Sequence, residues 1–233
     1  MTDGSDEASL SKLAAGTLAG GAALASAGGL YYASKVEPMN VEIKEVSLVL
    51  PRLSAEFDGY RVAQISDIHM DGWMTFERLS KLAHLVNEQE ADLIAATGDF
   101  VTAKVKYVEG ELAEALSILE APDGAVAVLG NHDYIADESL VRRILEDAGI
   151  VELSNDFLTL ERGEGAFHVA GIDNFYQRRA RLDLILSRMP EEGAAMLLAH
   201  EPDFAEVSAP TGRFDLQPEL FMNDSKGQTE DVP

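Results

Sequence analysis

Four apolar runs in this chain have the length and composition of buried strands, and polar side chains of metal-ligand type follow each of them. The runs are YRVAQIS (60–66), DLIAAT (92–97), AVAVL (125–129) and AAMLLA (194–199). The side chains that follow them are Asp67 and His69, Asp99, Asn131 and His132, and His200. Loops beyond the C-terminal ends of strands are where α/β sheets place their ligands. The pattern therefore predicts a ligand site at these strand ends.

Each of these residues has an ordinary alternative when it is taken alone. An aspartate before a loop is usually a helix cap or a turn former, and a Gly-Asp pair such as Gly98-Asp99 is often just a turn. The combination is more specific, because D-x-H, GD, GNH and a final His occur in this order, each at a strand end. Carboxylate, imidazole and amide side chains of this kind suit Mn, Mg, Zn or Fe.

The remaining hydrophobic pattern predicts an α/β fold. Apolar positions at helical spacing indicate a helix over 75–90, and further helices are expected around 112–119, at 138–148 and at 180–188. Alternating apolar and polar residues in VEIKEVSLVL indicate a half-buried strand at 41–50. Short strands are expected near 150–153, 157–160 and 167–170. Strand and helix alternate first, which predicts parallel βαβ units, and the later short strands predict a partly antiparallel sheet packed beside them.

Acidic residues strongly outnumber basic ones, with 41 Asp plus Glu against 18 Lys plus Arg and a formal net charge of −23. A field of this sign repels nucleic acid, so nucleic-acid binding is not expected. We interpret the excess acid as a halophilic adaptation, because at about 1 M salt the Debye length falls to roughly 3 Å and self-repulsion is screened. An ordinary acidic cytosolic protein is the alternative.

Arg178, Arg179 and Arg181 form a small basic cluster, which is either a phosphate contact or the solvated start of a helix.

Residues 1–35 combine a polar, acidic start with an apolar segment. No charged residue occurs between Lys12 and Lys35, and a segment of this length can span roughly 30 Å of hydrocarbon as a helix. Its many small residues also suit an export signal. We expect residues 13–34 to act as a membrane anchor or an uncleaved signal, with a flexible leader as the alternative.

Several motifs resemble those of the calcineurin-like metallophosphoesterases: ISDIH, DLIAATGD, VAVLGNHDY, HVAGIDN and LLAHEPDFA. Within that superfamily the chain is similar to bacterial and archaeal phosphodiesterases that often carry an export signal or a membrane anchor. The resemblance runs from about Tyr60 to Gln217. It implies a four-layer α/β/β/α sandwich for a domain spanning residues 41–217. It also implies a small-molecule or lipid-linked phosphoester substrate and a membrane-anchored domain on the outer face, with a cytoplasmic location as the alternative.

The resemblance implies two divalent metal ions, which could be Mn, Zn, Fe or Mg. Asp67 and His69 would bind the first ion, Asn131 and His200 would bind the second, and Asp99 would bridge both. The implied reaction is two-metal hydrolysis of a phosphodiester or phosphomonoester, in which a water held between ions roughly 3.5–4 Å apart attacks phosphorus in line.

His132 has a different implied role, because it would not bind metal. It would contact the phosphate and protonate the leaving oxygen as a general acid.

The chain departs from the family pattern at its C-terminal end. In the family a Gly-His-x-His-Gly-Gly segment follows the strand represented here by 214–217, and its two histidines complete the ligand sets of the two metals. Residues 218–233 instead form an atypical polar tail, PELFMNDSKGQTEDVP, and no histidine occurs after His200. The sandwich is therefore expected to be incomplete at its C-terminus. A catalytically disabled or truncated protein that retains weak metal binding is the alternative function.

A nucleotide-binding α/β module without metal is a third reading of the same strand pattern. It is disfavoured because neither G-x-G-x-x-G nor a P-loop follows any strand.

Overall fold

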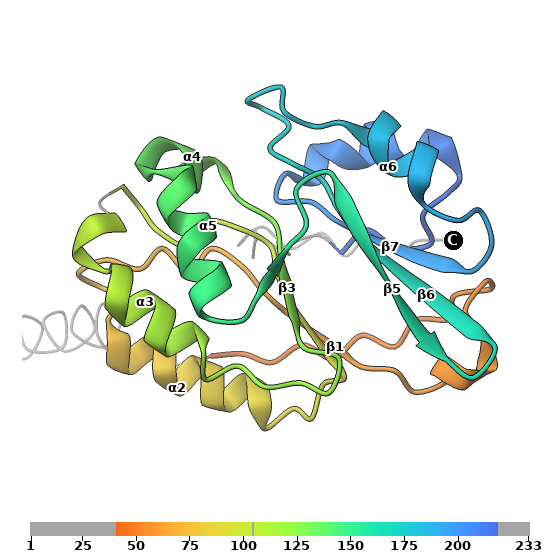
Figure 1. Cartoon of the computed structure of the whole chain (residues 1–233). Coiled ribbons are helices and arrows are strands. Elements are labelled where there is room, and N and C mark those ends of the chain that lie inside the picture. The colour runs from red at the N-terminus through yellow and green to blue at the C-terminus, as the bar shows by residue number, and fades with distance from the viewer. Residues whose placement is uncertain (1–40, 104, 219–233) are drawn as a thin grey trace, which may run out of the picture. The chain divides into compact units, whose positions relative to one another are not determined.

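The computed structural model describes residues 41–103 and 105–218 (Figure 1). The chain divides into two units, residues 1–47 and 48–233. The described part of the first unit, residues 41–47, has no regular secondary structure and is exposed. All the helices and strands reported below belong to the second unit.

The first sheet has four parallel strands in the order β1-β2-β3-β4. These strands are β1 (Val62–Ile65), β2 (Leu93–Ala96), β3 (Ala125–Ala127) and β4 (Val151–Glu152). The helices between them are α2 (Phe76–Asn87), α3 (Glu109–Leu116), α4 (Asn131–Ala136) and α5 (Glu138–Asp147). Because all four strands run in the same direction, the loops after β1, β2 and β3 meet at one edge of the sheet.

The second sheet has three strands in the order β5-β6-β7, antiparallel between β5 and β6 and parallel between β6 and β7. They are β5 (Asp156–Arg162), β6 (Gly165–Gly171) and β7 (Ala194–Leu198), with α6 (Leu182–Arg188) before β7 and α7 (Ala205–Ser208) after it. Leu216 makes a further parallel bridge to Met196. Short 3-10 helices lie at Ala55–Phe57, Val105–Tyr107, Pro202–Phe204 and Ala209–Thr211.

Three apolar clusters fill the spaces between four layers. On β2, Ile94 and Ala96 join the cluster packed against α2, α3 and α5, whereas Leu93 joins the cluster between the two sheets. On β7, Met196 also faces the first sheet, whereas Leu197 packs in the third cluster, which includes residues of α6 and of the 202–204 turn. This alternation is expected of strands buried on both faces. Figure 1 shows α2, α3 and α5 on one side of the sheets and α6 on the other. The predicted α/β/β/α sandwich is confirmed.

The strand predicted at 41–50 is wrong. These residues have no regular secondary structure, and Val49 is 94% exposed. A strand needs a neighbour to pair its backbone N–H and C=O groups, and no segment of the described chain pairs with residues 41–50. Alternation of apolar residues indicates which face a strand would bury, but it does not supply the partner.

Two other predicted features lie outside the described residues: the apolar segment 13–34 and nearly all of the tail 218–233. Within the described ranges, no helix combines the length and the apolar character that crossing a membrane requires.

Candidate metal centre

Three of the predicted ligands lie together at the edge of the first sheet. His69 Nε2 is 3.3 Å from Asp99 Oδ2 and 3.7 Å from Asp67 Oδ1. One ligand atom from each of these residues lies within 4.8 Å of the others, as a shared metal ion would require. Two carboxylates and an imidazole suit a hard or borderline divalent ion.

The other two predicted ligands also lie beside the Asp99 carboxylate. His200, which follows β7, has its Nε2 3.6 Å from Asp99 Oδ2 and 3.1 Å from Asn131 Oδ1. The same oxygen of Asp99 therefore lies within 4 Å of both histidine nitrogens. The structure brings together all five residues to which the sequence assigned metal binding.

A backbone hydrogen bond orients the His200 ring. Its Nδ1 lies 2.8 Å from the carbonyl oxygen of Thr97. A carbonyl only accepts, so Nδ1 carries the proton and Nε2 presents its lone pair to the Asp99 carboxylate. A histidine held in this way by a carbonyl is typical of metal ligands. The arrangement fits a cation bound between them, because the Nε2 lone pair of the neutral His200 ring and the negative Asp99 carboxylate otherwise face each other.

His69 lacks a comparable backbone partner. Its Nδ1 is buried and has no hydrogen-bond partner among the described residues, while its Nε2 faces the carboxylates of Asp67 and Asp99. The ring packs edge-on against the ring of His132, with centroids 4.8 Å apart.

His132 lies in the first turn of α4, beside the ligands. Its backbone N–H donates to Asp99 Oδ1 over 2.8 Å. Its ring Nδ1 lies 2.9 Å from the carbonyl oxygen of Thr102, so the proton is on Nδ1 in the neutral ring and Nε2 is free. Sequence reasoning treated residues 130–133 as a loop and missed α4, which places this donor at the start of a helix.

The backbone at the site is strained. Asp67, His69 and Asp99 have φ values of 50°, 46° and 55°, in the left-handed region that costs residues other than glycine on the order of 1–3 kcal/mol each. Hydrogen bonds between the β1 and β2 loops, from Asp67 N to Gly98 O and from His69 N to Asp99 O, hold this conformation. The strain turns all three side chains toward a common point.

Two glycines make the close approach of the loops possible. A Cβ atom on Gly98 would lie 2.4 Å from Gly130 N, and one on Gly130 would lie 2.1 Å from Asp99 Oδ1. Any side chain at Gly130 would therefore displace the shared carboxylate.

The sequence prediction assigned no role to Asp133, which holds the site together. Its side chain is fully buried and accepts hydrogen bonds from the backbone N–H groups of Gly130, Asp99 and Phe100, each 2.9 Å long. Burial raises the pKa of Asp133 to about 7, against the opposing effect of the Gly130 N–H donor. The signal that could have found it is a capping box, since Asp133 is the third residue of a helix that follows Gly130.

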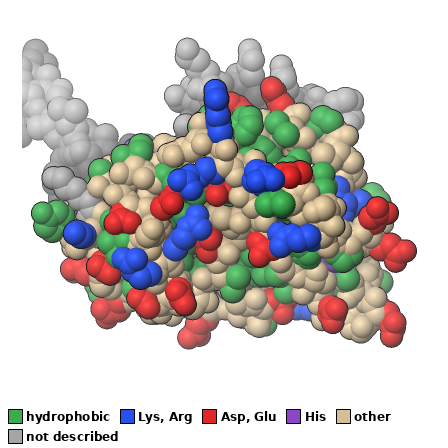
Figure 2. Space-filling view, turned by 45° about the horizontal axis from the view of Figure 1, so that its top comes forward, with side chains coloured by type: hydrophobic (Ala, Val, Ile, Leu, Met, Phe, Trp, Pro, Cys, Tyr) green, Lys and Arg blue, Asp and Glu red, His purple; other side chains and the backbone are tan. Residues whose placement is uncertain are grey.

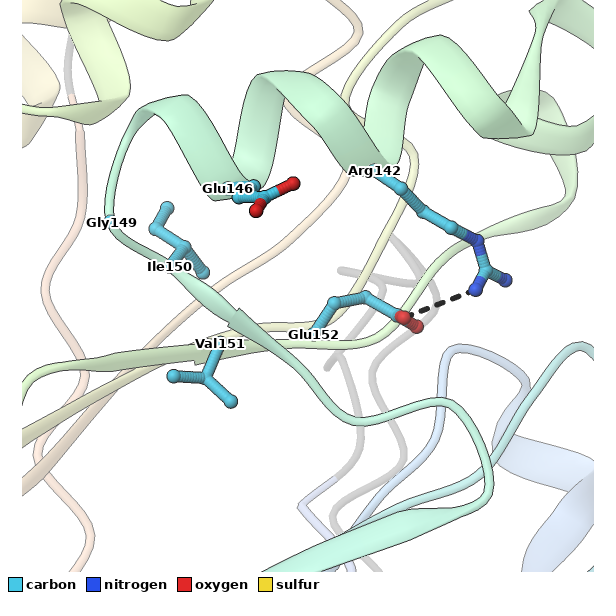
Figure 3. Close-up of a pocket in the computed structure, with 6 residues that line it drawn as sticks. All are labelled: Arg142, Glu146, Gly149, Ile150, Val151 and Glu152. Carbon is cyan, nitrogen blue, oxygen red and sulfur yellow. Dashed lines mark hydrogen bonds and ion pairs between the residues drawn. The ribbon is translucent and has the colours of Figure 1, made fainter.

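A surface pocket lies away from these ligands, beside α5 and β4. It has a volume of about 480 Å³ and is lined by Arg142, Glu146, Gly149, Ile150, Val151 and Glu152 (Figure 3). An ion pair of 3.1 Å between Arg142 and Glu152 crosses it. None of the predicted site residues lines this pocket, so it is not part of the metal centre.

Comparison with known proteins agrees with this geometry. Residues 60–222 match the family described as calcineurin-like phosphoesterase. The metallophosphoesterase YkuE of Bacillus subtilis, named as uncharacterized, is 32% identical over 193 residues, which cover 82% of this chain and 67% of the relative. A second Bacillus subtilis metallophosphoesterase, YkoQ, is 31% identical over 147 residues, covering 61% of this chain and 53% of the relative.

A relative with a named substrate is the UDP-2,3-diacylglucosamine pyrophosphatase LpxG of Chlamydia trachomatis. It is 36% identical over 104 residues, which cover 44% of this chain and 31% of the relative. The chain thus matches about two thirds of YkuE and smaller shares of YkoQ and LpxG. The family match spans residues 60–222, and the alignment with YkuE covers 82% of this chain. The chain therefore belongs to the calcineurin-like phosphoesterase family, whose members are hydrolases acting on phosphoric esters.

Proposed function

We propose that this protein hydrolyses a phosphodiester or phosphomonoester at two divalent metal ions held by the loops after β1, β2, β3 and β7. The observation that carries the proposal is the shared Asp99 carboxylate, whose Oδ2 is 3.3 Å from His69 Nε2 and 3.6 Å from His200 Nε2. Asp67 and His69 would hold one ion, and Asn131 and His200 the other. When bound, such ions lower the pKa of a water toward about 7 and offset the negative charge of phosphoryl oxygens.

The protein's own residues would orient the ligands and move the proton. Asp99 would contact both ions, with its Oδ1 kept in place by the His132 N–H. His132 would give a proton from Nε2 to the oxygen that leaves phosphorus, and it would do so from the doubly protonated ring, because the Nδ1 proton stays bonded to Thr102 O. The attacking water would lose a proton to solvent and bond to phosphorus, the bond from phosphorus to the leaving oxygen would break, and the proton from His132 would let that oxygen leave as an alcohol.

The second candidate is a catalytically disabled protein that retains weak metal binding. The small number of ligands in the second group, around Asn131 and His200, favours this candidate. Among residues 41–103 and 105–218, that group has only Asn131 and His200 besides the shared Asp99. The chain has five histidines, and the two outside the site lie on α2 (His84) and within β6 (His168). His168 is buried and bonded to Thr159 and to the carbonyl of Glu192. If no further ligand completes the second group, one ion would bind and turnover would fail.

The substrate class remains part of the proposal. The name of LpxG gives a lipid-linked pyrophosphate as its substrate, so a lipid-linked phosphoester is one candidate here and a small soluble diester is the other. Attachment to a membrane through residues 13–34 would favour the lipid-linked class. Fractionation of the full chain beside a version lacking residues 1–40 tests this attachment, and recovery of both in the soluble fraction would contradict it.

The test of the main proposal is hydrolysis of bis-p-nitrophenyl phosphate with added Mn, together with the metal content of the purified protein. Asp99→Asn should abolish turnover and lower the metal content. Asp92→Asn at the opposite edge of the sheet is the matched control and should change neither. Turnover that survives Asp99→Asn would reject the site, whereas one bound ion without turnover would support the disabled protein. Absence of metal at any concentration would support a metal-free nucleotide-binding module.

A further inference from the structure

The connection between β6 and α6 is an ordered loop that contains none of the candidate metal ligands. We call residues 172–181 the arginine loop, because Arg178, Arg179 and Arg181 lie in it. In Figure 1 it rises between α4 and α6 above the strand ends. Figure 2, which brings this side forward, shows Lys and Arg side chains over the middle of the face, with Asp and Glu side chains among them.

The arginine loop is attached to both elements that carry the second ligand group. Glu201, next to His200, accepts a hydrogen bond from Phe175 N over 3.2 Å. On the other side, the hydroxyl of Tyr134 in α4 donates to Asp173 Oδ1, and α4 begins at Asn131. The arginine loop is therefore anchored to the two segments that carry Asn131 and His200.

A single side chain closes the base of the arginine loop. Asn155 Oδ1 accepts hydrogen bonds from Asp173 N at one end and from Arg181 N at the other, over 3.3 and 2.7 Å. Its Nδ2 donates to Arg179 O over 3.0 Å. Backbone bonds then fold the tip, from Arg178 N to Phe175 O and from Arg179 N to Asn174 O. The loop is preorganised, although it contains no regular helix or strand.

The three arginines differ in what they already bind. Arg179 pairs with Glu138 at 3.4 Å and lies over the ring of Tyr134. Arg181 pairs with Asp183 at 2.8 Å. Arg178 is exposed, and its guanidinium makes no ion pair or hydrogen bond with any residue in the described ranges. It lies at the tip of the turn with φ of 59°. A planar guanidinium matches phosphate oxygens through paired hydrogen bonds.

We propose that Arg178 binds a second anionic group of the substrate, a phosphate beyond the one at the metal centre. This proposal rests on the proposed function, because it takes the first phosphate to lie at the Asp99 site. It assigns the preferred substrates to the class that carries two neighbouring phosphates, as a pyrophosphate diester does. The side chains of Arg179 and Arg181 are already paired with Glu138 and Asp183, so Arg178 is the one that binds the second anion.

The test uses the full chain with Mn and two probes that differ by one phosphonate, methylphosphonate and methylenediphosphonate. Neither has an ester bond to hydrolyse, so calorimetry reports binding alone. Arg178→Gln should weaken the binding of methylenediphosphonate about tenfold, which corresponds to about 1.4 kcal/mol. It should change the affinity for methylphosphonate by less than about twofold. Arg181→Gln removes the same charge from the same loop and should leave both affinities unchanged. Arg178→Lys should restore part of the loss, since charge remains but the paired geometry does not.

The outcomes separate this inference from the proposed function. If Asp99→Asn abolishes methylphosphonate binding but Arg178→Gln leaves both affinities unchanged, the second anion site is rejected and the metal centre stands. Equal losses in Arg178→Gln and Arg181→Gln would reject it as well, because they would reflect general charge. If methylphosphonate binding is insensitive to Asp99→Asn, or if neither probe binds, both proposals fail.

Discussion

The two edges of the first sheet both carry carboxylates, and they differ in what surrounds them. At the edge where the strands begin, Arg162 on β5 pairs with Asp92 at 3.0 Å and with Asp123 at 3.2 Å. Asp123 also accepts from the Tyr60 hydroxyl, and the guanidinium lies over the rings of Phe57 and Tyr60. The Arg162 cation and the Tyr60 hydroxyl satisfy these acids, and the aromatic rings pack against the cation.

At the edge where the strands end, no Arg or Lys side chain in the described ranges pairs with Asp67, Asp99 or Asp133. Asp99 is buried and faces the nitrogens of His69 and His200, on a backbone with three left-handed residues. Strain and unbalanced charge persist only where the surrounding structure holds them and where a ligand relieves them. The contrast separates an edge built for stability from an edge built for binding.

The largest expected effect is on stability at the beginning edge. Phe57 is fully buried and packs edge-on against Tyr60 and Phe167, so Phe57→Ala should lower the free energy of unfolding by about 3–5 kcal/mol. Urea unfolding measures it. Tyr107→Ala, at an 84% exposed ring, is the control and should stay within about 0.5 kcal/mol. A loss of metal affinity in the folded fraction of Phe57→Ala would break the proposed separation of the edges.

The second prediction concerns activity at the ending edge. Gly130→Ala places a Cβ atom on Asp99 Oδ1 and should reduce turnover of bis-p-nitrophenyl phosphate about 100-fold, or about 2.7 kcal/mol. Gly72→Ala adds the same methyl group in open space nearby and should leave the rate unchanged. Equal rates for the two variants would show that the position of the Asp99 carboxylate does not limit the reaction.

A third prediction compares one carboxylate from each edge without metal. In a chelator, Asp99→Asn should raise the free energy of unfolding by about 1 kcal/mol, because it removes a buried charge that has no cation. Asp123→Asn should lower it, because Arg162 loses a partner. Thermal melts with and without Mn measure both, and Mn should stabilise the native chain but not Asp99→Asn. Destabilisation by Asp99→Asn in chelator would mean that the carboxylate is already satisfied.

The smallest effect is a pH dependence at the beginning edge. Burial alone would raise the pKa of Asp92, but the Arg61 N–H and the Arg162 guanidinium outweigh it, so the pKa lies below its usual value. A lowered pKa in the folded state stabilises the protein above the unfolded value of about 3.9, and this contribution is lost as pH falls through the folded value. Arg162→Gln should flatten the acid limb of stability between about pH 5 and 2. An unchanged acid limb would contradict this role for Arg162.

Much of the fold follows from local pattern. Strands β2 and β7 are continuous apolar runs, so their positions could be predicted from the sequence. In the structure their alternating faces pack on two different clusters. The helix at Phe76–Asn87 agrees with the prediction for 75–90 to within a turn at each end. The segment 41–50 could not be predicted correctly, because a strand depends on a partner elsewhere in the chain.

The sequence predicts which candidate ligands lie together, but it does not predict the residues that hold them in place. Asp67, His69, Asp99, Asn131 and His200 stand at strand ends in the sequence, and the parallel sheet brings them to one edge. Asp133 also accepts from the backbone N–H groups of Asp99 and Phe100 on another loop, and contacts of that kind leave no trace in residue identity. The clamps of the arginine loop are likewise contacts between distant segments, such as Asn155 with Arg181.

The buried Asp133 carboxylate has a consequence for how the binding of one metal ion affects the binding of another. It accepts from Gly130 on the β3 loop and from Asp99 and Phe100 on the β2 loop, so these segments form one rigid unit. Asp99 in that unit belongs to both ligand groups. If two ions bind, the first would position both loops of this unit together, so the second ion would find its ligands already in place. Metal uptake by this chain should therefore be cooperative, with a Hill coefficient above one, and uncoupling the two loops at Asp133 should return it to independent binding.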